Sequence, residues 1–294
     1  MRLNNDYINE LLEFEKIQNG LYIIATPIGN LSDITIRSLK ILSCVDLILC
    51  EDSKTSKKLT SKYGIRTPLK PFHKFNSTRS IPFLTNRLEL GQSMALICDA
   101  GTPLISDPGA DLVKCCIKKD IKVFSIPGPS ATIGSFVLSN FAEKSFLFRG
   151  FFPRQKKDAI KEIDVIKKMD CPIIFFESPK RILKSFTFIQ DNYGNCDVTF
   201  VRELTKINEE IINTTISKII STLRKREKIL GEITFILKPL KNMQKEEITK
   251  KDILLLSDKL SKDGLNISEI SKTISSDFNL SKRDVYQLLI KNKY

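Results

Sequence analysis

The sequence predicts an α/β protein in which two α/β domains enclose a cleft and a small C-terminal helical module follows them. Short β-rich apolar runs alternate with amphipathic helical segments through most of the chain, which indicates α/β architecture. The C-terminal part instead contains three short amphipathic segments joined by polar turns, which indicates helices alone. A length of 294 residues is enough for two domains with cores of ordinary size.

The first domain begins with a β-α-β unit. Leu21–Ala25 is a β-rich run that ends at a Pro/Gly turn, Ser32–Asp46 has its apolar residues on one helical face, and Leu47–Asp52 is the next strand. The pattern then repeats with a strand over Met94–Asp99, a helix from Gly109, a strand over Lys122–Pro127 and a helix near Ser130. Because β-α-β units produce parallel strands with right-handed crossovers, we expect a parallel sheet.

A second series of strands and helices follows Ser145 and predicts an α/β domain with mixed strand directions. Its expected strands are Phe146–Pro153, Cys171–Pro179, Asp197–Leu204, Glu209–Ile216 and Gly231–Pro239. Its expected helices are Lys156–Met169, Lys180–Gln190 and Ser217–Arg226. Since the break near Phe141–Ser145 offers no long flexible linker, the two domains should pack closely around the cleft.

A charged connector after Leu240 leads to the three amphipathic segments of the C-terminal module. These segments are Ile253–Leu260, Ile267–Ser276 and Lys282–Ile290. Their order resembles a helix-turn-helix, whose last helix would contact nucleic acid through Lys282 and Arg283; a packing or dimerisation role is the alternative. The expected organisation is a polar tail over 1–20, α/β domains over 21–144 and 145–240, and the helical module over 241–294.

Net charge points to an anionic partner. The chain has 47 Lys and Arg residues against 34 Asp and Glu residues, a net charge of +13, and the stretch from Ser53 to Arg87 has nine basic residues and no acidic one. Tyr63, Phe72 and Phe75 lie among these cations, and such a mixture suits phosphate contacts with base stacking. A solvated surface with ordinary core aromatics is the alternative. The expected nucleic-acid contacts here are Lys54, Lys57, Lys58 and Lys62.

Several classes of protein are disfavoured by composition. The seven cysteines are odd in number and form no Cys-x-x-Cys pair, so we expect no disulfide framework and no metal site. No apolar run approaches the roughly 18–20 residues that cross a bilayer, and the N-terminus lacks a signal-peptide core. We therefore expect a cytoplasmic protein without a membrane contact.

Four loops follow strand carboxyl ends and should meet at one edge of the first sheet, where parallel sheets bind ligands. They are Thr26–Asn30, Cys50–Lys54, Asp99–Gly109 and Pro127–Ala131. None has the glycine pattern of a dinucleotide site or a P-loop.

The loop Asp99–Gly109 carries Asp99 and Asp107 but no Lys or Arg, so it suits a cation or a ligand with amine and hydroxyl groups rather than phosphate. S-adenosylmethionine fits, because its sulfonium and α-amine are positively charged. The alternative is that Asp107 and Asp111 cap the following helix, and we expect this of at least one of them.

These motifs resemble those of the bacterial ribosomal RNA small-subunit methyltransferase I family. The matching segments are Leu21–Asp52, Asp99–Gly109, Pro127–Ala131, Gly150–Arg154, Phe175–Ile182, Arg202–Lys206 and Gly231–Leu237. The resemblance implies the tetrapyrrole methylase-like fold of class III S-adenosylmethionine enzymes, with two α/β domains around a cofactor cleft, a helix-turn-helix module and a homodimer. It also implies 2′-O-methylation of a cytidine ribose in 16S rRNA of the small ribosomal subunit, near the decoding site.

The resemblance also implies site residues. The cofactor-binding residues would be Pro27, Gly29, Asp99, Gly101, Thr102, Ser130, Ala131, Gly231 and Glu232. A general base stays unidentified, with Glu51, Asp52, Glu177 and Glu203 as candidates by loop position. Lys54, Lys180 or Lys206 would supply a cation that favours the alkoxide. His73, the only histidine, fits an RNA-facing surface position better than a catalytic one.

Two other functions remain open at this point. A small-molecule methyltransferase of the same fold could act on a tetrapyrrole, although the basic stretch argues against it. A non-catalytic RNA-binding assembly protein could have inherited the fold, although it would not need the loops of a cofactor site.

Overall fold

The computed structural model of the chain describes residues 17–142, 144–240, 250–262, 264–278 and 280–293. The chain divides between Lys238 and Pro239 into two compact units. Most of the expected N-terminal tail (residues 1–16) and most of the charged connector (residues 241–249) lie outside the described residues. Within the described part, none of the helices combines the length and apolar character that a bilayer crossing requires.

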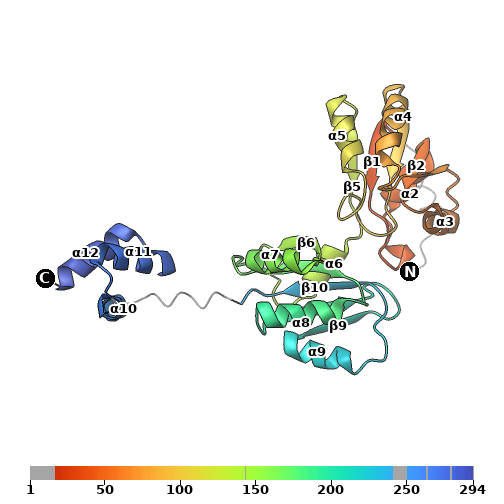
Figure 1. Cartoon of the computed structure of the whole chain (residues 1–294). Helices are drawn as coiled ribbons and strands as arrows, with labels where there is room; N and C mark the ends of the chain where they lie inside the picture. The colour runs from red at the N-terminus through yellow and green to blue at the C-terminus, as the bar shows by residue number, and fades with distance from the viewer. Residues whose placement is uncertain (1–16, 143, 241–249, 263, 279, 294) are drawn as a thin grey trace. The chain divides into compact units, whose positions relative to one another are not determined.

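The first sheet has five parallel strands in the order β3-β2-β4-β1-β5. Figure 1 labels β1, β2 and β5 among them. The strands are β1 (Gly20–Ile24), β2 (Leu47–Cys50), β3 (Leu69–Pro71), β4 (Ser93–Leu96) and β5 (Val123–Ile126). This confirms the expected parallel sheet. Strand β3 was not predicted, because it has only three residues and ends in a proline, which lacks the backbone N–H that a central strand donates. The proline is tolerated because β3 is an edge strand.

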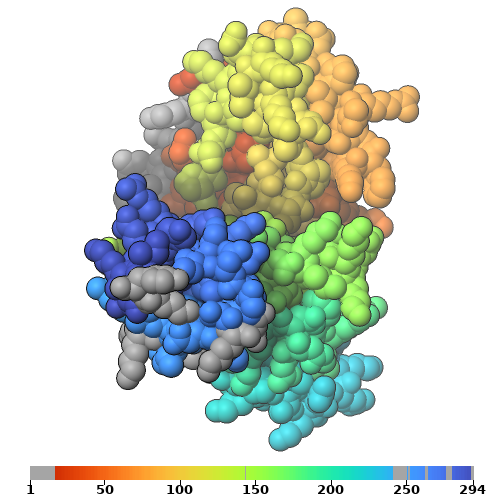
Figure 2. Space-filling view, turned by 60° about the vertical axis from the view of Figure 1, so that its left-hand side comes forward, coloured from red at the N-terminus to blue at the C-terminus, as the bar shows by residue number. Residues whose placement is uncertain are grey.

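Helices cover both faces of this sheet, because alternate strand residues point to opposite sides. The helices in this part of the chain are α2 (Ile36–Cys44), α3 (Ser53–Lys62), α4 (Ser77–Glu89) and α5 (Ala110–Lys118), with a short 3-10 turn η1 (Leu31–Asp33). Leu21 and Ile23 of β1 pack in one apolar cluster with residues of α4 and α5, which lie side by side (Figure 1, Figure 2). Tyr22 and Ile24 pack in another with residues of α2.

The second sheet is mixed, as expected, with the order β6-β7-β10-β8-β9. Its strands are β6 (Leu147–Phe151), β7 (Ile173–Glu177), β8 (Asp197–Arg202), β9 (Glu210–Thr215) and β10 (Ile233–Leu237). Strands β6 and β7 are parallel, and the other neighbours are antiparallel. One face forms a core around Phe175, Phe186 and Phe235 with helices α7 (Lys156–Ile166), α8 (Ile182–Asn192) and α9 (Ile216–Arg224).

Helix α6 (Ala131–Val137) packs against the second sheet, although it directly follows the last loop of the first. Phe136 of this helix is buried with Ile174 of β7 and Ile236 of β10, on the face away from α8. Helix α6 therefore belongs to the layer that covers the second sheet, although the chain reaches it directly from the first.

The second unit contains three described helices, α10 (Lys250–Lys262), α11 (Ile267–Phe278) and α12 (Lys282–Lys293), near the three expected segments. Their small core includes Ile253, Ile270 and Leu289. Lys282 and Arg283 are exposed at the start of α12. Whether they contact RNA stays a prediction.

Candidate active site

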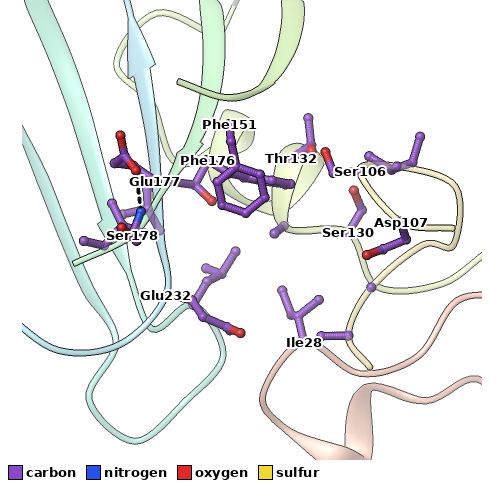
Figure 3. A pocket seen from close by; sticks show the side chains of 18 of the residues that line it. Ile28, Ser106, Asp107, Ser130, Thr132, Phe151, Phe176, Glu177, Ser178 and Glu232 are labelled. Carbon is purple, nitrogen blue, oxygen red and sulfur yellow. Dashed lines mark hydrogen bonds between the residues drawn. The ribbon is translucent and has the colours of Figure 1, made fainter. Parts of the chain in front are cut away.

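A cavity of about 390 Å³ lies in the first unit between loops of the first sheet and the edge of the second sheet. The first sheet contributes lining residues from 28, 99–102, 105–107 and 130–132, and the second from 151, 176–179, 201, 204 and 231–234. Figure 3 shows Asp107 and Ser130 on one side of the cavity and Ser178 and Glu232 on the other. This position at the carboxyl ends of parallel strands is where ligands bind in such sheets.

Hydrogen bonds join three loops of the first sheet into one wall. The backbone N–H of Thr26 donates to the carbonyl of Gly101 (2.8 Å), and the N–H of Gly101 donates back to the carbonyl of Thr26 (2.9 Å). Thr26 Oγ1 donates to the carbonyl of Cys98 (3.0 Å), and Thr102 Oγ1 donates to the carbonyl of Pro129 (3.3 Å). Gly101 has a φ of +81°, a conformation that favours glycine. The wall is thus built from backbone groups held at fixed positions.

The central loop continues through an unusual backbone path. Leu104 and Ser106 have φ values of +72° and +73°, which non-glycine residues seldom adopt. Gly109 has a φ of +130°, and a Cβ atom there would lie 2.6 Å from a methyl carbon of Leu96. This path places Ser106 and Asp107 in the cavity lining. Such strain occurs often in functional loops, where the surrounding structure maintains it.

The expectation that Asp107 or Asp111 caps the following helix is wrong. The N-cap of α5 is Gly109, and among the described residues no side chain makes a cap hydrogen bond at this helix. The loop turns Asp107 into the cavity lining instead, and Asp111, in the first turn of α5, pairs with Lys114 (3.7 Å). Asp107 therefore faces the cavity, where its carboxylate also interacts with the Cys98 thiol.

Carboxylates gather at this edge of the sheet. The backbone N–H of Asp52 donates to Asp99 Oδ1 (3.1 Å). Burial raises the pKa of Asp99 and of Asp107, and the Asp99 charge raises the pKa of Asp107 further. Burial, followed by the charges of Asp107 and Asp99, also raises the pKa of Glu51. A cationic ligand would relieve this mutual repulsion.

The structure brings seven of the nine expected cofactor residues together. The lining includes Asp99, Gly101, Thr102, Ser130, Ala131, Gly231 and Glu232. Pro27 and Gly29 are not part of it, whereas Ile28 between them is. A Cβ atom at Gly29 would lie 2.4 Å from Lys206 Cγ and 2.8 Å from Thr205 Oγ1, so this glycine permits close packing of the first loop against the loop after β8. That these residues bind a cofactor stays a prediction.

The chain matches known proteins along most of its length. Residues 20–220 match the family of tetrapyrrole (corrin/porphyrin) methylases. The chain is 43% identical over 217 residues to ribosomal RNA small subunit methyltransferase I of Thermotoga maritima, covering 74% of this chain and 97% of that protein. It is 36% identical over 273 residues to the Bacillus subtilis protein of the same name, covering 90% and 92%. The chain belongs to the ribosomal RNA small subunit methyltransferase I family, a branch of the tetrapyrrole methylases.

Solved structures confirm the expected fold class for this member of the family. Diphthine synthase aligns with a TM-score of 0.58 at 11% identity, covering 74% of this chain and 89% of that chain. A cobalt precorrin-4 methyltransferase of cobalamin biosynthesis aligns with a TM-score of 0.54 at 17% identity, covering 74% and 93%. These similarities establish the two-domain methylase fold.

The candidate base Glu177 lines the cavity, but its carboxylate is already engaged. The backbone N–H of Ser178 donates to Glu177 Oε1 (2.7 Å, dashed in Figure 3), Ser185 Oγ donates to Oε2, and an Arg181 nitrogen lies 3.2 Å from Oε2. The side chain of Glu177 is fully buried. A buried carboxylate with this set of partners is better suited to holding the loop after β7 than to accepting a proton.

Glu203 forms part of a three-residue ionic cluster at the cavity edge. Lys206 Nζ donates to Glu203 Oε1 (2.8 Å) and Glu232 Oε2 (2.9 Å), and the backbone N–H of Glu232 also donates to Glu203 Oε1 (2.9 Å). The hydrogen bond from Lys206 lowers the pKa of Glu203. Glu203 is therefore a poor proton acceptor, and Lys206 is occupied by two carboxylates.

The other candidates lie outside the cavity lining. Asp52 is the N-cap of α3 and accepts a hydrogen bond from the backbone N–H of Lys54 (2.8 Å). Glu51 is half-buried, whereas Lys54 and Lys180 are exposed. The remaining expected RNA contacts of α3, Lys57, Lys58 and Lys62, are also exposed.

Sequence reasoning missed the apolar wall and one polar atom. Phe151 and Phe176 line the cavity with their rings 5.7 Å apart, and Ile28 and Ile105 add to the apolar surface (Figure 3). Thr132 also lines the cavity, and among the described residues its buried Oγ1 has no hydrogen-bond partner. Because side chains alternate between the two faces of a strand, the sequence of β6 could have predicted on which face of the sheet Phe151 lies. Only the packing of the two domains shows that this face lines the cavity.

Proposed function

We propose that this protein transfers a methyl group from S-adenosylmethionine to the 2′-hydroxyl of a cytidine ribose in 16S rRNA of the small ribosomal subunit, near the decoding site. The observation that carries the proposal is the cavity wall in which Asp99 and Asp107 accompany fixed backbone groups and an apolar surface. The similar proteins named ribosomal RNA small subunit methyltransferase I support an rRNA substrate. The nucleoside and the hydroxyl follow from the family resemblance.

The cavity residues fit the cofactor. A volume of about 390 Å³ lies in the range of small-ligand pockets. Asp99 and Asp107 would face its positive groups, the unpaired Thr132 hydroxyl would meet a polar group, and the Phe151–Phe176 wall would contact the adenine. When bound, S-adenosylmethionine supplies an electrophilic methyl group on a good leaving group. The protein's main task is therefore to position the ribose hydroxyl in line with it.

Removal of the hydroxyl proton requires a carboxylate with an unoccupied oxygen and a pKa moved toward neutrality. Glu177 fails this requirement because both of its oxygens accept hydrogen bonds, and Glu203 fails it because the hydrogen bond from Lys206 lowers its pKa. Glu51 and Asp107 meet it better, because burial raises the pKa of each and Asp107 lines the cavity. We assign proton removal to this pair, of which Asp107 lines the cavity.

The basic stretch Ser53–Arg87 supports RNA rather than a tetrapyrrole as the acceptor. Its helix α3 starts one residue after Asp52, beside the carboxylate cluster, and exposes lysines that no described residue neutralises. A homodimer and a cytoplasmic location accompany this proposal and stay predictions.

The test is a methyl-transfer assay with small ribosomal subunits from cells that lack the enzyme. The purified protein and methyl-labelled S-adenosylmethionine should place label on an alkali-resistant ribose of 16S rRNA, and nuclease mapping should identify the nucleotide. Label on a base, or on a nucleotide distant from the decoding site, would contradict the specificity. Cofactor binding without RNA label would favour a small-molecule acceptor, and RNA binding without cofactor binding would favour an assembly protein.

A further inference from the structure

The basic stretch Ser53–Arg87 contains four Tyr and Phe side chains, and the structure gives them different environments. Phe72 is in the core of the first sheet with 1% of its surface exposed. Tyr63 is half-buried, and its hydroxyl donates to the carbonyl of Leu31 (2.8 Å). These two rings stabilise the domain and cannot stack on a ligand.

The other two rings reach the surface. Phe83 is 52% exposed, but Lys70 Nζ lies 5.3 Å from its ring centroid and Arg87 Cζ lies 5.6 Å from it, so cations cover this ring. Phe75 is 93% exposed. Its described ring neighbour, His73, meets it edge-on with a centroid distance of 6.1 Å and an interplanar angle of 64°. The ring of Phe75 therefore remains open to solvent.

The loop that carries Phe75 is held by its own hydrogen bonds. The backbone N–H of His73 donates to Asn76 Oδ1 (2.8 Å), and Asn76 Nδ2 donates to the carbonyl of Pro71 (3.0 Å). The backbone N–H of Ser77 donates to the carbonyl of His73 (3.0 Å), which starts helix α4. Phe75 is thus an exposed aromatic residue on a short, braced turn. Such pre-organisation lowers the entropy cost of binding.

The same turn lies at the edge of the sheet where the cavity loops emerge. Strands β2 and β3 are parallel, with Cys50 paired to Pro71, and the backbone N–H of Phe72 donates to the carbonyl of Cys50 (2.7 Å). The chain therefore leaves both strands at one edge, toward Glu51 after β2 and toward Phe75 after β3. Exposed lysines begin at Lys54 on the β2 side.

We propose that Phe75 is a stacking platform for an unpaired nucleobase of single-stranded RNA, with Lys74 and the exposed lysines of α3 contacting the flanking phosphates. The inference rests on the proposed function, in which RNA is the acceptor. RNA fits better than a protein partner, because the segment joins an open aromatic face to nine cations with no acidic residue. The base would be a neighbour of the methylated nucleotide, since the turn flanks the cavity loops without lining the cavity.

The experiment measures binding of the full chain to a short single-stranded RNA that contains 2-aminopurine, whose fluorescence falls when the base stacks. Phe75→Ala should weaken binding about tenfold to a hundredfold and abolish the fluorescence change, because base–aromatic stacking has this magnitude. Phe75→Trp should retain the affinity for RNA and the fluorescence change. The dependence of affinity on salt should be unchanged in Phe75→Ala, because no phosphate contact is removed.

The matched control is Leu90→Ala. Leu90 is an apolar side chain of the same domain with 77% of its surface exposed, but it precedes β4 and so lies at the opposite edge of the sheet. This variant should bind like the unchanged protein. Equal RNA binding by Phe75→Ala and the unchanged protein would overturn the inference, and methyl transfer to rRNA by both would show that the proposed function survives. If Phe75→Ala lost binding to the ribosomal subunit but kept full affinity for the oligonucleotide, Phe75 would contact a ribosomal protein. That result would also overturn the inference.

Discussion

The acidic loop Asp99–Gly109 and the parts of the basic stretch Ser53–Arg87 that follow β2 and β3 flank the same edge of one sheet, but the two segments have opposite designs. The loop is braced by backbone hydrogen bonds, and of its two cavity-lining carboxylates Asp107 is half-buried and Asp99 is exposed. Desolvation raises the pKa of both. The stretch exposes its lysines except Lys70, which is half-buried on β3, and among the described residues none of its cations is in a salt bridge.

The two regions differ in the number and setting of their charges, and this difference matches ligands of different size. Half-buried charges in a strained loop act strongly on one small ligand, because water screens them poorly and their positions are set. Exposed lysines act weakly and in number on a polyanion, and salt reduces their effect. The four predictions below test this contrast, from the largest expected effect to the smallest.

Charge reversal of Lys57, Lys58 and Lys62 to Glu should lower affinity for the small ribosomal subunit by about a hundredfold or more at low salt, because three phosphate contacts become repulsive. Affinity for S-adenosylmethionine, measured by calorimetry, should not change. The control reverses Lys156, Lys157 and Lys167, three exposed lysines at the ends of α7, with the same change in net charge. If both triple variants lost the same affinity for the small ribosomal subunit, the net charge of the protein, and not the basic stretch, would account for binding.

Gly109→Ala should lower the free energy of unfolding by about 3 kcal/mol, because a Cβ atom there meets side-chain carbons of Leu96 and Leu104 at 2.6 and 2.7 Å and φ is +130°. Gly64→Ala is the matched change within the basic stretch. Gly64 has a φ of +65°, but a Cβ atom there would meet no other atom within 4 Å, so its cost should be about 1 kcal/mol. Urea unfolding measures the free energy of unfolding of both variants. Equal decreases would show that the central loop rearranges to accommodate the added methyl group.

Asp99→Ala should weaken S-adenosylmethionine binding about tenfold, since a carboxylate that lines the cavity next to a positive ligand group is lost. The fold should remain, because Asp99 is at the cavity surface rather than in the core. Asp111→Ala is the control, as Asp111 is exposed and pairs with Lys114 alone among the described residues. Unchanged affinity in Asp99→Ala would remove Asp99 from the site.

Lowering the pH from 7 toward 5 should weaken cofactor binding several-fold. Burial raises the pKa of Asp99, Asp107 and Glu51, so these groups take up protons at a higher pH than ordinary carboxyl groups do and lose their attraction for a cation. The same shift means that their ionised forms destabilise the ligand-free fold near neutrality, and this penalty decreases as the pH falls through the raised pKa values.

Calorimetry across this pH range would measure the effect. The double variant Asp99→Asn and Asp107→Asn should bind the cofactor weakly but with a flatter pH profile. A profile as steep as that of the unchanged protein would show that another group controls binding.

Much of the fold could be predicted because the strands are short apolar runs with clear ends. Leu21–Ala25 and Gly231–Pro239 each contain most or all of an observed strand, and the central loops follow as turns. Strand β3 could not be predicted, because a three-residue edge strand has almost no pattern of its own. The packing of α6 on the second sheet also has no local signal, since its apolar face fits either sheet.

By itself, the sequence determined that acidic and glycine-bearing loops end parallel strands and that basic residues cluster between Ser53 and Arg87. These are properties of local order and composition, which neighbouring residues alone establish. Only the tertiary structure decided that Asp107 faces the cavity instead of capping α5, that Glu177 and Glu203 are already engaged, and that Phe75 rather than Phe72 is open. The physical reason is that burial and pairing depend on groups contributed by distant segments, so the role of a charged or aromatic side chain is set when those segments pack together.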